Sequence, residues 1–257
     1  MDTTSTPALG LSMTEPPARP EPERGLAVVL GAGGGLGAAL VEALQRPEGA
    51  TGGRVLALGR SSTPAIDYAD EASLQNAAAW VSAHCEAQHT ELRLLLVASG
   101  FLHGASGQPE RSWAHLEPAY LRQVFEVNAI GPALVMKHFL PLLPKTGRCV
   151  AGFVSAKVGS IGDNALGGWY GYRASKAALN QLVKTAAIEL KRRNPQALCV
   201  ALHPGTVATA LSAPFSKSGL NVRQPAVAAD ELLSVLAGLD ASCSGQLVDY
   251  QGKVLPW

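Results

Sequence analysis

The chain has 257 residues, of which 47% are hydrophobic, and its 21 basic and 20 acidic residues leave a formal net charge of +1. This length is enough for one well-buried core, and the nearly neutral charge gives no electrostatic basis for binding nucleic acid or an anionic membrane surface. No apolar run approaches the ~18 residues that a membrane-spanning helix needs, so the expected partner is a small molecule.

Residues 1–24 are predicted to be a disordered leader, because five prolines interrupt any helix there. The leader lacks the apolar stretch of a signal peptide, and its acidic residues argue against an organellar transit peptide. The four cysteines are widely separated and form no metal-ligand pattern, which is typical of reduced thiols in a cytoplasmic protein. Residues 25–257 are expected to form one dinucleotide-binding domain without a metal.

A glycine-rich turn follows the first predicted strand. Residues 26–30 are an apolar run, typical of a parallel strand covered on both faces, and they lead into a turn over residues 31–37 and a helix over residues 36–45. Such a turn can be a flexible loop, but between a strand and a helix it predicts a cradle for a pyrophosphate, because N–H groups at a helix start attract anions. The residues expected to contact the cofactor are Gly31, Gly35, Leu36 and Gly37.

Residues 54–58 are predicted to form the second strand, and Gly59 and Arg60 stand where a carboxylate would otherwise bind the adenosine ribose. The guanidinium of Arg60 suits a 2′-phosphate, which favours NADP(H) over NAD(H). The alternative is that Arg60 is only a solvated loop residue.

The connection after the second strand is short. Only residues 61–65 separate Arg60 from Ile66 and Asp67, whereas a crossover to a parallel neighbour takes a dozen or more residues. We therefore expect the helix after strand 2 to be missing and strand 3 to be reduced or absent. Asp67 either reaches the adenine or is a plain surface aspartate, and a helix over residues 70–88 follows, capped by Asp70 or Ser73.

Residues 93–99 form the next predicted strand, and it ends at Ser99 and Gly100, where the backbone can pass close to a bound ribose. A long helix over residues 117–143 is expected to break near Gly131 and Pro132. Asn128 lies just before that break, so it could hold a water molecule or a lysine instead of capping a turn. A strand over residues 149–155 follows.

The helix predicted from residue 169 or 170 to residue 193 carries Tyr172 and Lys176, which lie on one helical face because they are four residues apart. A fixed positive charge lowers the pKa of a nearby phenol, which would make Tyr172 a general acid or base. The alternative is a solvated lysine beside a packed tyrosine. Apolar residues cover more than one face, so we expect a homo-oligomer (dimer or tetramer) through the helices at 117–143 and 170–193, or full burial within one subunit.

The last part of the chain begins with a strand over residues 197–202, which stops at His203-Pro204-Gly205. Thr206 and Thr209 then offer hydroxyls to a cofactor, residues 211–225 are predicted to form a mobile lid, and a helix (225–239) and a strand (246–250) follow. The alternation of strands and helices predicts an α/β fold, namely a single Rossmann-type, doubly wound parallel sheet.

Taken in this order, four motifs resemble the short-chain dehydrogenase/reductase family, and within it the C-factor-like and sniffer-type carbonyl reductase branch. The resemblance covers residues 26–257. The motifs are Gly31-x3-Gly35-x-Gly37, Val127-Asn128-Ala-Ile-Gly131, Tyr172-x3-Lys176 and His203-Pro204-Gly205-Thr206-Val207-x-Thr209.

The resemblance implies an NADP(H)-dependent oxidoreductase that moves hydride between nicotinamide and a small carbonyl or alcohol substrate. In that family pattern Tyr172 donates or accepts the proton, Lys176 lowers its pKa and bonds the nicotinamide ribose, and Asn128 holds a water molecule. By the same matching, Asp67 would contact the adenine. The remaining cofactor contacts would come from Ser99, Gly100, Pro204, Gly205, Val207 and Thr209, with Thr209 at the nicotinamide end.

One departure from the family pattern concerns the substrate-binding serine, because Ala156 stands at its position. Ser155 is the catalytic residue expected in its place, provided that the strand end is shifted by one residue, since neighbours on a strand point to opposite sides. Ser160 is a second candidate, and neither is a third possibility. Ala156 also motivates an alternative function, a cofactor-binding signalling or interaction protein with weak or no turnover.

Overall fold

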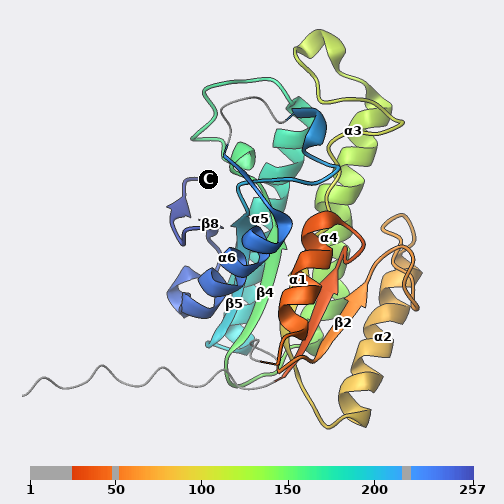
Figure 1. Ribbon diagram of the computed structural model, residues 1–257, viewed down its shortest axis with the longest axis vertical. Coiled ribbons are helices and arrows are strands. Elements are labelled where there is room, and N and C mark those ends of the chain that lie inside the picture. The colour runs from red at the N-terminus through yellow and green to blue at the C-terminus, as the bar shows by residue number, and fades with distance from the viewer. Residues whose placement is uncertain (1–24, 48–51, 216–220) are drawn as a thin grey trace, which may run out of the picture.

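Seven strands form the central sheet in the order β2-β1-β3-β4-β5-β8-β9, and all of them are parallel except β9. The computed structural model describes residues 25–47, 52–215 and 221–257 (Figure 1). The strands of the sheet are β1 (Leu26–Leu30), β2 (Val55–Leu58), β3 (Leu92–Val97), β4 (Cys149–Val154), β5 (Ala197–His203), β8 (Leu247–Asp249) and β9 (Val254–Leu255). The predicted α/β fold with a Rossmann-type parallel sheet is confirmed.

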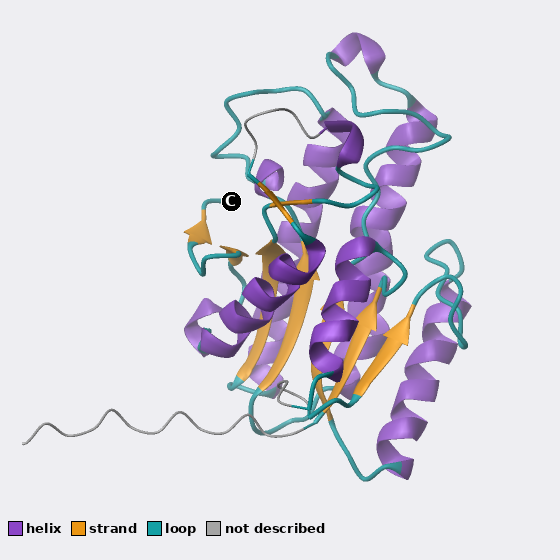
Figure 2. Ribbon diagram, viewed as in Figure 1, coloured by secondary structure: helices purple, strands orange, loops and turns teal. Residues whose placement is uncertain are grey.

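Helices cover both faces of the sheet. The main helices are α1 (Gly35–Gln45), α2 (Glu71–Ala87), α3 (Pro118–Phe125), α4 (Gly131–Phe139), α5 (Tyr170–Arg193) and α6 (Pro225–Gly238). Figure 1 shows α1 and α6 in front of the sheet, with α4 and α5 behind it. The arrowheads of the parallel strands point to one common edge, toward the top of Figure 2, and that carboxyl edge is where ligands bind in open α/β sheets.

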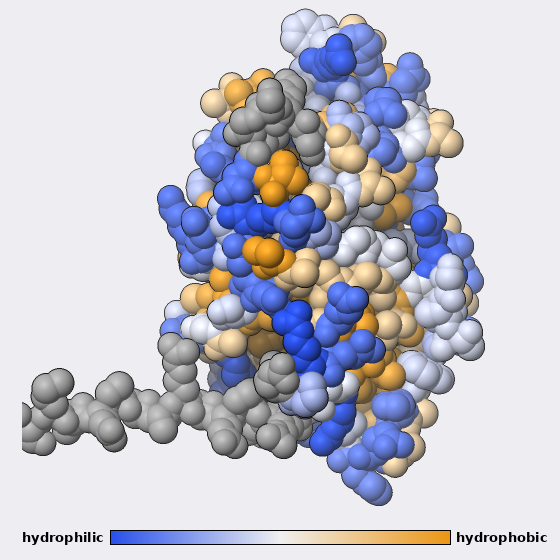
Figure 3. All heavy atoms as spheres, viewed as in Figure 1, coloured by the Kyte–Doolittle hydropathy of each residue, from blue (hydrophilic) through white to orange (hydrophobic). Residues whose placement is uncertain are grey.

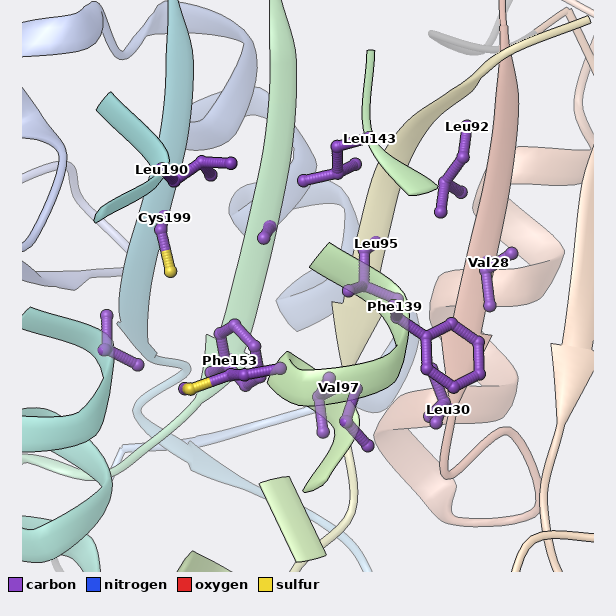
Figure 4. Close-up of a cluster of buried hydrophobic side chains, with 14 of the residues drawn as sticks. Val28, Leu30, Leu92, Leu95, Val97, Phe139, Leu143, Phe153, Leu190 and Cys199 are labelled. Atoms are coloured by element: carbon purple, nitrogen blue, oxygen red, sulfur yellow. The ribbon is translucent and has the colours of Figure 1, made fainter. Parts of the chain in front are cut away.

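The strand β1 shows why both faces are covered, since all five of its residues are buried. Leu26, Val28 and Leu30 face a core cluster under α2, α4 and α5, whereas Ala27 and Val29 face a second cluster under α1 and α6. Successive side chains of a strand point to opposite faces, so a strand between two helical layers must be apolar throughout. Figure 4 shows part of the first cluster.

The edge strand β2 is followed by an irregular segment. Residues 59–70, all of them described, contain neither helix nor strand, and the chain then enters α2 and returns on the far side of β1 as β3. Asp70 caps α2, because its side chain accepts a hydrogen bond from the Ala72 N–H at 3.0 Å. The segment therefore occupies the sheet edge beside the glycine turn.

The predicted helix over residues 117–143 is divided into α3 and α4 by a π-helical turn at Glu126–Ile130. The distortion ends next to Gly131, near the position at which the sequence predicts a break. A β-carbon on Gly131 would come within 2.3 Å of the Tyr68 ring, so only glycine lets α4 approach the segment after β2. Such wide turns often mark functional sites, and this one holds Asn128.

The region around the predicted lid contains a short parallel pair, β6 (Thr206–Val207) with β7 (Val222–Arg223), and one 3₁₀ turn at Ala213–Phe215. Residues 216–220 of that lid, and the predicted leader at 1–24, lie outside the described residues. Within the described ranges, none of the helices has the length and apolar character to cross a membrane. Figure 3 shows hydrophilic and hydrophobic residues mixed over the visible face.

Candidate active site

The glycine turn between β1 and α1 forms a tight bend with an open outer side. Gly31 has a φ of +83°, and its N–H donates to the Leu58 carbonyl at 2.9 Å, which joins the turn to the end of β2. A β-carbon on Gly37 would lie 2.1 Å from the Gly31 carbonyl oxygen, so the bend needs glycine there too. By contrast, a β-carbon on Gly33 would meet no atom within 4 Å. Open space above a helix N-terminus fits a pyrophosphate.

The segment after β2 lies beside this turn. The position of a β-carbon on Gly59 is 3.7 Å from the Gly33 nitrogen, and Arg60, the next residue, is exposed. Its guanidinium makes no hydrogen bond or ion pair with the described part of the chain, so it is available to a phosphate. Asp67 is also exposed, and its carboxylate accepts from the Ala69 N–H at 3.0 Å.

The start of the segment after β3 lies close to both the glycine turn and α5. A β-carbon on Gly31 would lie 2.6 Å from the Ser99 nitrogen, and one on Gly100 would lie 3.8 Å from Asn128 Oδ1 and 4.0 Å from Lys176 Nζ. The predicted cofactor residues Ser99 and Gly100 therefore lie between the turn and the buried Lys176. The Lys176 amine donates to the Val154 carbonyl at 2.8 Å.

Asn128 is completely buried and is held by three hydrogen bonds. Its amide accepts from the Phe101 N–H and donates to the Phe101 carbonyl, both at 2.8 Å, and it also donates to Ser175 Oγ at 3.1 Å. Ser175 in turn donates to the Tyr172 carbonyl at 2.8 Å. Asn128 thus links the end of β3 to the first turns of α5.

Tyr172 is 7% exposed, and its ring lies 6.0 Å from Lys176 Nζ. Burial raises the pKa of Tyr172 to about 12, and burial also lowers the pKa of Lys176 to about 7. The prediction that the lysine lowers the pKa of this phenol is therefore wrong for the protein by itself, because loss of hydration is larger than any attraction between the two groups.

Ala156 and the two serines considered in its place, Ser155 and Ser160, lie in different surroundings. Ser155 is buried, and its hydroxyl donates to Asn180 Oδ1 at 2.7 Å, which argues against its predicted role as a donor to substrate. Ala156 instead packs in the apolar cluster that contains Tyr172. Ser160 is 2% exposed, and its oxygen accepts from the Asp163 N–H at 3.1 Å.

The segment after β5 reaches the glycine turn. Gly205, with a φ of +72°, follows the buried Pro204, and Val207 in β6 is buried as well. A β-carbon on Gly35 would come within 2.8 Å of Thr209 Cγ2, so Thr209 lies against the start of α1. This packing brings the last predicted cofactor motif to the same cradle.

Sequence reasoning missed several neighbours of these residues. Tyr68 is linked to Ser99 by a hydroxyl contact of 2.6 Å, and Glu110 accepts from the Gly171 N–H. Trp169 contacts both Tyr172 and Phe215 edge to face, with ring centroids 6.1 and 5.2 Å apart. Most of these pairs are far apart in the sequence, so no local spacing predicts them. The sequence marked position 169 only as a possible start of the helix.

Comparison with known proteins gives a family and a fold. A family model described as short chain dehydrogenase matches residues 25–219. The C-signal of Myxococcus xanthus is 36% identical over 141 residues, which cover 54% of this chain and 80% of that protein. The 1-hydroxy-2-glutathionyl-2-methyl-3-butene dehydrogenase of Rhodococcus sp. (strain AD45) is 34% identical over 137 residues, which cover 53% of this chain and 58% of the dehydrogenase.

Two solved structures share the fold. The NADPH-bound carbonyl reductase from chicken fatty liver is 24% identical, with a TM-score of 0.77, and the match covers 90% of this chain and 98% of the reductase. The carbonyl reductase Sniffer of D. melanogaster is 23% identical, with a TM-score of 0.76 and coverage of 91% and 100%. Both likenesses support the predicted Rossmann-type fold.

Proposed function

Because this chain belongs to the short-chain dehydrogenase family, we propose that it is an NADP(H)-dependent oxidoreductase that transfers hydride between nicotinamide and a small carbonyl or alcohol substrate. The observation that carries the proposal is the close spacing from Gly31 past Ser99 and Gly100 to Lys176, one helical turn from Tyr172. A dinucleotide over the glycine turn would extend along these residues toward the phenol.

The cofactor, when bound, supplies or accepts the hydride. The Tyr172 phenol is the proposed proton donor to the substrate oxygen, and its raised pKa of about 12 keeps it protonated at neutral pH, as carbonyl reduction requires. Lys176 would turn its amine to the nicotinamide ribose beside Gly100. Asn128 would hold the end of β3 and α5 together, and as the family resemblance implies, it would hold a water molecule.

The apolar cluster around Tyr172 indicates a fairly apolar substrate. It combines Ala156, Val158, Trp169, Leu211 and Phe215, which come from three separate segments of the chain. An apolar wall removes water from the reacting carbonyl, and this strengthens the hydrogen bond from the phenol.

The choice of NADP(H) over NAD(H) is proposed from the exposed, unpaired Arg60 beside the glycine turn. NADPH is the cofactor named for the chicken reductase, which supports the assignment. Arg60→Ala should raise the dissociation constant of NADPH and leave that of NADH nearly unchanged. An unchanged NADPH dissociation constant, measured by fluorescence titration, would contradict the role given to Arg60.

Purified protein with NADPH and a panel of aldehydes, ketones and quinones tests the activity. We expect turnover that falls by about 100-fold or more in Tyr172→Phe, because that variant keeps the ring and removes the proton. NADPH binding should be the same in both proteins. Equal turnover in the two proteins would refute Tyr172 as the proton donor.

A second function is favoured by Ala156, which leaves an apolar side chain in the cluster around Tyr172. A protein of this fold could bind the cofactor and act as a signalling or interaction protein with weak or no turnover. Tight NADPH binding without turnover of any compound in the panel would favour this second function.

We further propose a cytoplasmic homo-oligomer. Ile130 and Ile188, which are 52% and 50% exposed on the predicted interface helices, would contact a second subunit.

A further inference from the structure

Glu110 is a buried carboxylate at the start of the helix that carries Tyr172. It is 2% exposed, and both of its carboxylate oxygens accept from the Gly171 N–H, at 3.2 and 3.1 Å. We propose that Glu110 is a positioning residue for the reaction, whose carboxylate sets Tyr172 by holding the first turn of α5, directly after the strained Trp169. The inference rests on the proposed function.

The backbone before α5 is left-handed over three residues. Gly167 and Gly168 have φ values of +65°, and Trp169 has a φ of +53° and a ψ of +42°. Glycine adopts this region freely, but a tryptophan there is strained unless its neighbours hold it. Such strain is typical of functional sites, and here it occurs three residues before Tyr172.

Hydrogen bonds hold this turn from two sides. On one side the Glu110 carbonyl accepts from the Trp169 N–H at 2.6 Å, in addition to the contact of its carboxylate with Gly171. On the other side the Arg173 guanidinium donates to the carbonyls of Gly168 at 3.0 Å and Gly167 at 3.2 Å. The conformation of this turn therefore depends on the backbone carbonyl of Glu110 and on the side chain of Arg173.

Glu110, which is distant in the sequence, caps α5, because the residue at the N-cap position packs against other aromatic rings. Trp169 occupies the N-cap position and makes no side-chain hydrogen bond to the helix. Its indole lies edge to face against Tyr172 on one side and Phe215 on the other. A serine or aspartate at position 169 would cap the helix locally but would remove this aromatic contact. Glu110 supplies the cap, so that position 169 can hold an indole.

The buried carboxyl group of Glu110 has few polar neighbours. Removing a carboxylate from water is costly, and among the described residues the only hydrogen-bond donor to this one is the Gly171 N–H. The positive end of the α5 dipole offsets part of that cost. The same charge also adds to burial in raising the pKa of Tyr120, which lies in the cluster with Tyr172. The carboxylate is thus held next to the site that we assign to the reaction.

Glu110→Ala tests the proposal, with Glu110→Gln as the conservative variant and Glu117→Ala as a control at an exposed glutamate. We expect kcat of Glu110→Ala to fall by about 10-fold to about 100-fold, because a small displacement of a reacting group has an effect of that size. The NADPH dissociation constant should change less than about twofold. Glu110→Gln should recover most of kcat, because its amide oxygen still accepts from Gly171.

Two results would overturn the proposal. One is a kcat for Glu110→Ala equal to that of Glu117→Ala. The other is a parallel loss of kcat, cofactor affinity and melting temperature that Glu110→Gln does not repair, because a merely structural role predicts that pattern.

A readout without turnover separates this proposal from the proposed function. In protein with ¹³C-labelled tyrosine, the Tyr172 signal is assigned by its absence in Tyr172→Phe. Glu110→Ala should shift that signal and leave the signal of Tyr250 in place. If the unaltered protein lacks turnover, the proposed function fails, and the Tyr172 signal still decides the role of Glu110: an unmoved signal refutes it.

Discussion

The burial of Lys176 leads to a prediction that can be tested without any substrate. Lys176 is 2% exposed, its amine donates to the Val154 carbonyl at 2.8 Å, and burial lowers its pKa from 10.5 to about 7. Between these two pKa values the unfolded chain binds a proton that the folded chain does not bind. The free energy of unfolding must therefore rise with pH from about 7 to about 10.5, and this contribution is smallest at pH 7 and below.

The size of the effect follows from the shift. Each pH unit between the two pKa values adds about 1.4 kcal/mol, reduced near pH 7 where the folded amine is still half protonated. From pH 7 to pH 9, Lys176 should raise the free energy of unfolding by about 2 kcal/mol. Lys176→Met keeps the length of the side chain and removes the titration, so that variant should lack this rise.

Urea unfolding of the cofactor-free protein at pH 7 and pH 9 measures the difference. Thiols and phenols also titrate in this range, but they are common to both proteins and cancel when the two pH dependences are subtracted. Lys191→Met, at an exposed position near the end of the same helix, should behave like the unaltered protein. If Lys176→Met and the unaltered protein have the same pH dependence, Lys176 is charged in the folded state and the reasoning is refuted.

Three further predictions concern the cradle, the substrate oxygen and the assembly. Gly37→Ala should lower the melting temperature strongly, because its β-carbon would lie 2.1 Å from a backbone oxygen, whereas Gly33→Ala should keep that temperature and weaken NADPH binding in a fluorescence titration. Ala156→Ser should raise kcat by about 100-fold by adding a second hydrogen-bond donor, and an unchanged kcat would mean that the oxygen is bound elsewhere. Ile188→Lys should lower the apparent mass in size-exclusion chromatography, and an unchanged oligomer would exclude this face.

The parts of the fold that sequence predicted are those set by local pattern. The run at residues 26–30 is apolar because the strand is covered on both faces, and Gly37 is required by the Gly31 carbonyl within the same turn. The break near Gly131 was predicted, but the need for glycine at that position was not, because it comes from the ring of Tyr68, which approaches from another segment. Local periodicity carries no information about such an approach.

In the candidate site, too, the sequence predicted what depends on local spacing and not what depends on the rest of the fold. The prediction of a lowered pKa for Tyr172 failed for this reason. Spacing alone puts Tyr172 and Lys176 on one face of a helix, and that part of the inference needs only the geometry of α5. The charge state of each group depends instead on how much water the rest of the chain removes, and here burial opposes ionisation of both. Two groups that both avoid charge cannot stabilise each other as an ion pair. If Lys176 acts on this tyrosine, the anionic groups of a bound cofactor would favour its protonated form, and the phenol would then be more acidic with the cofactor bound than without it.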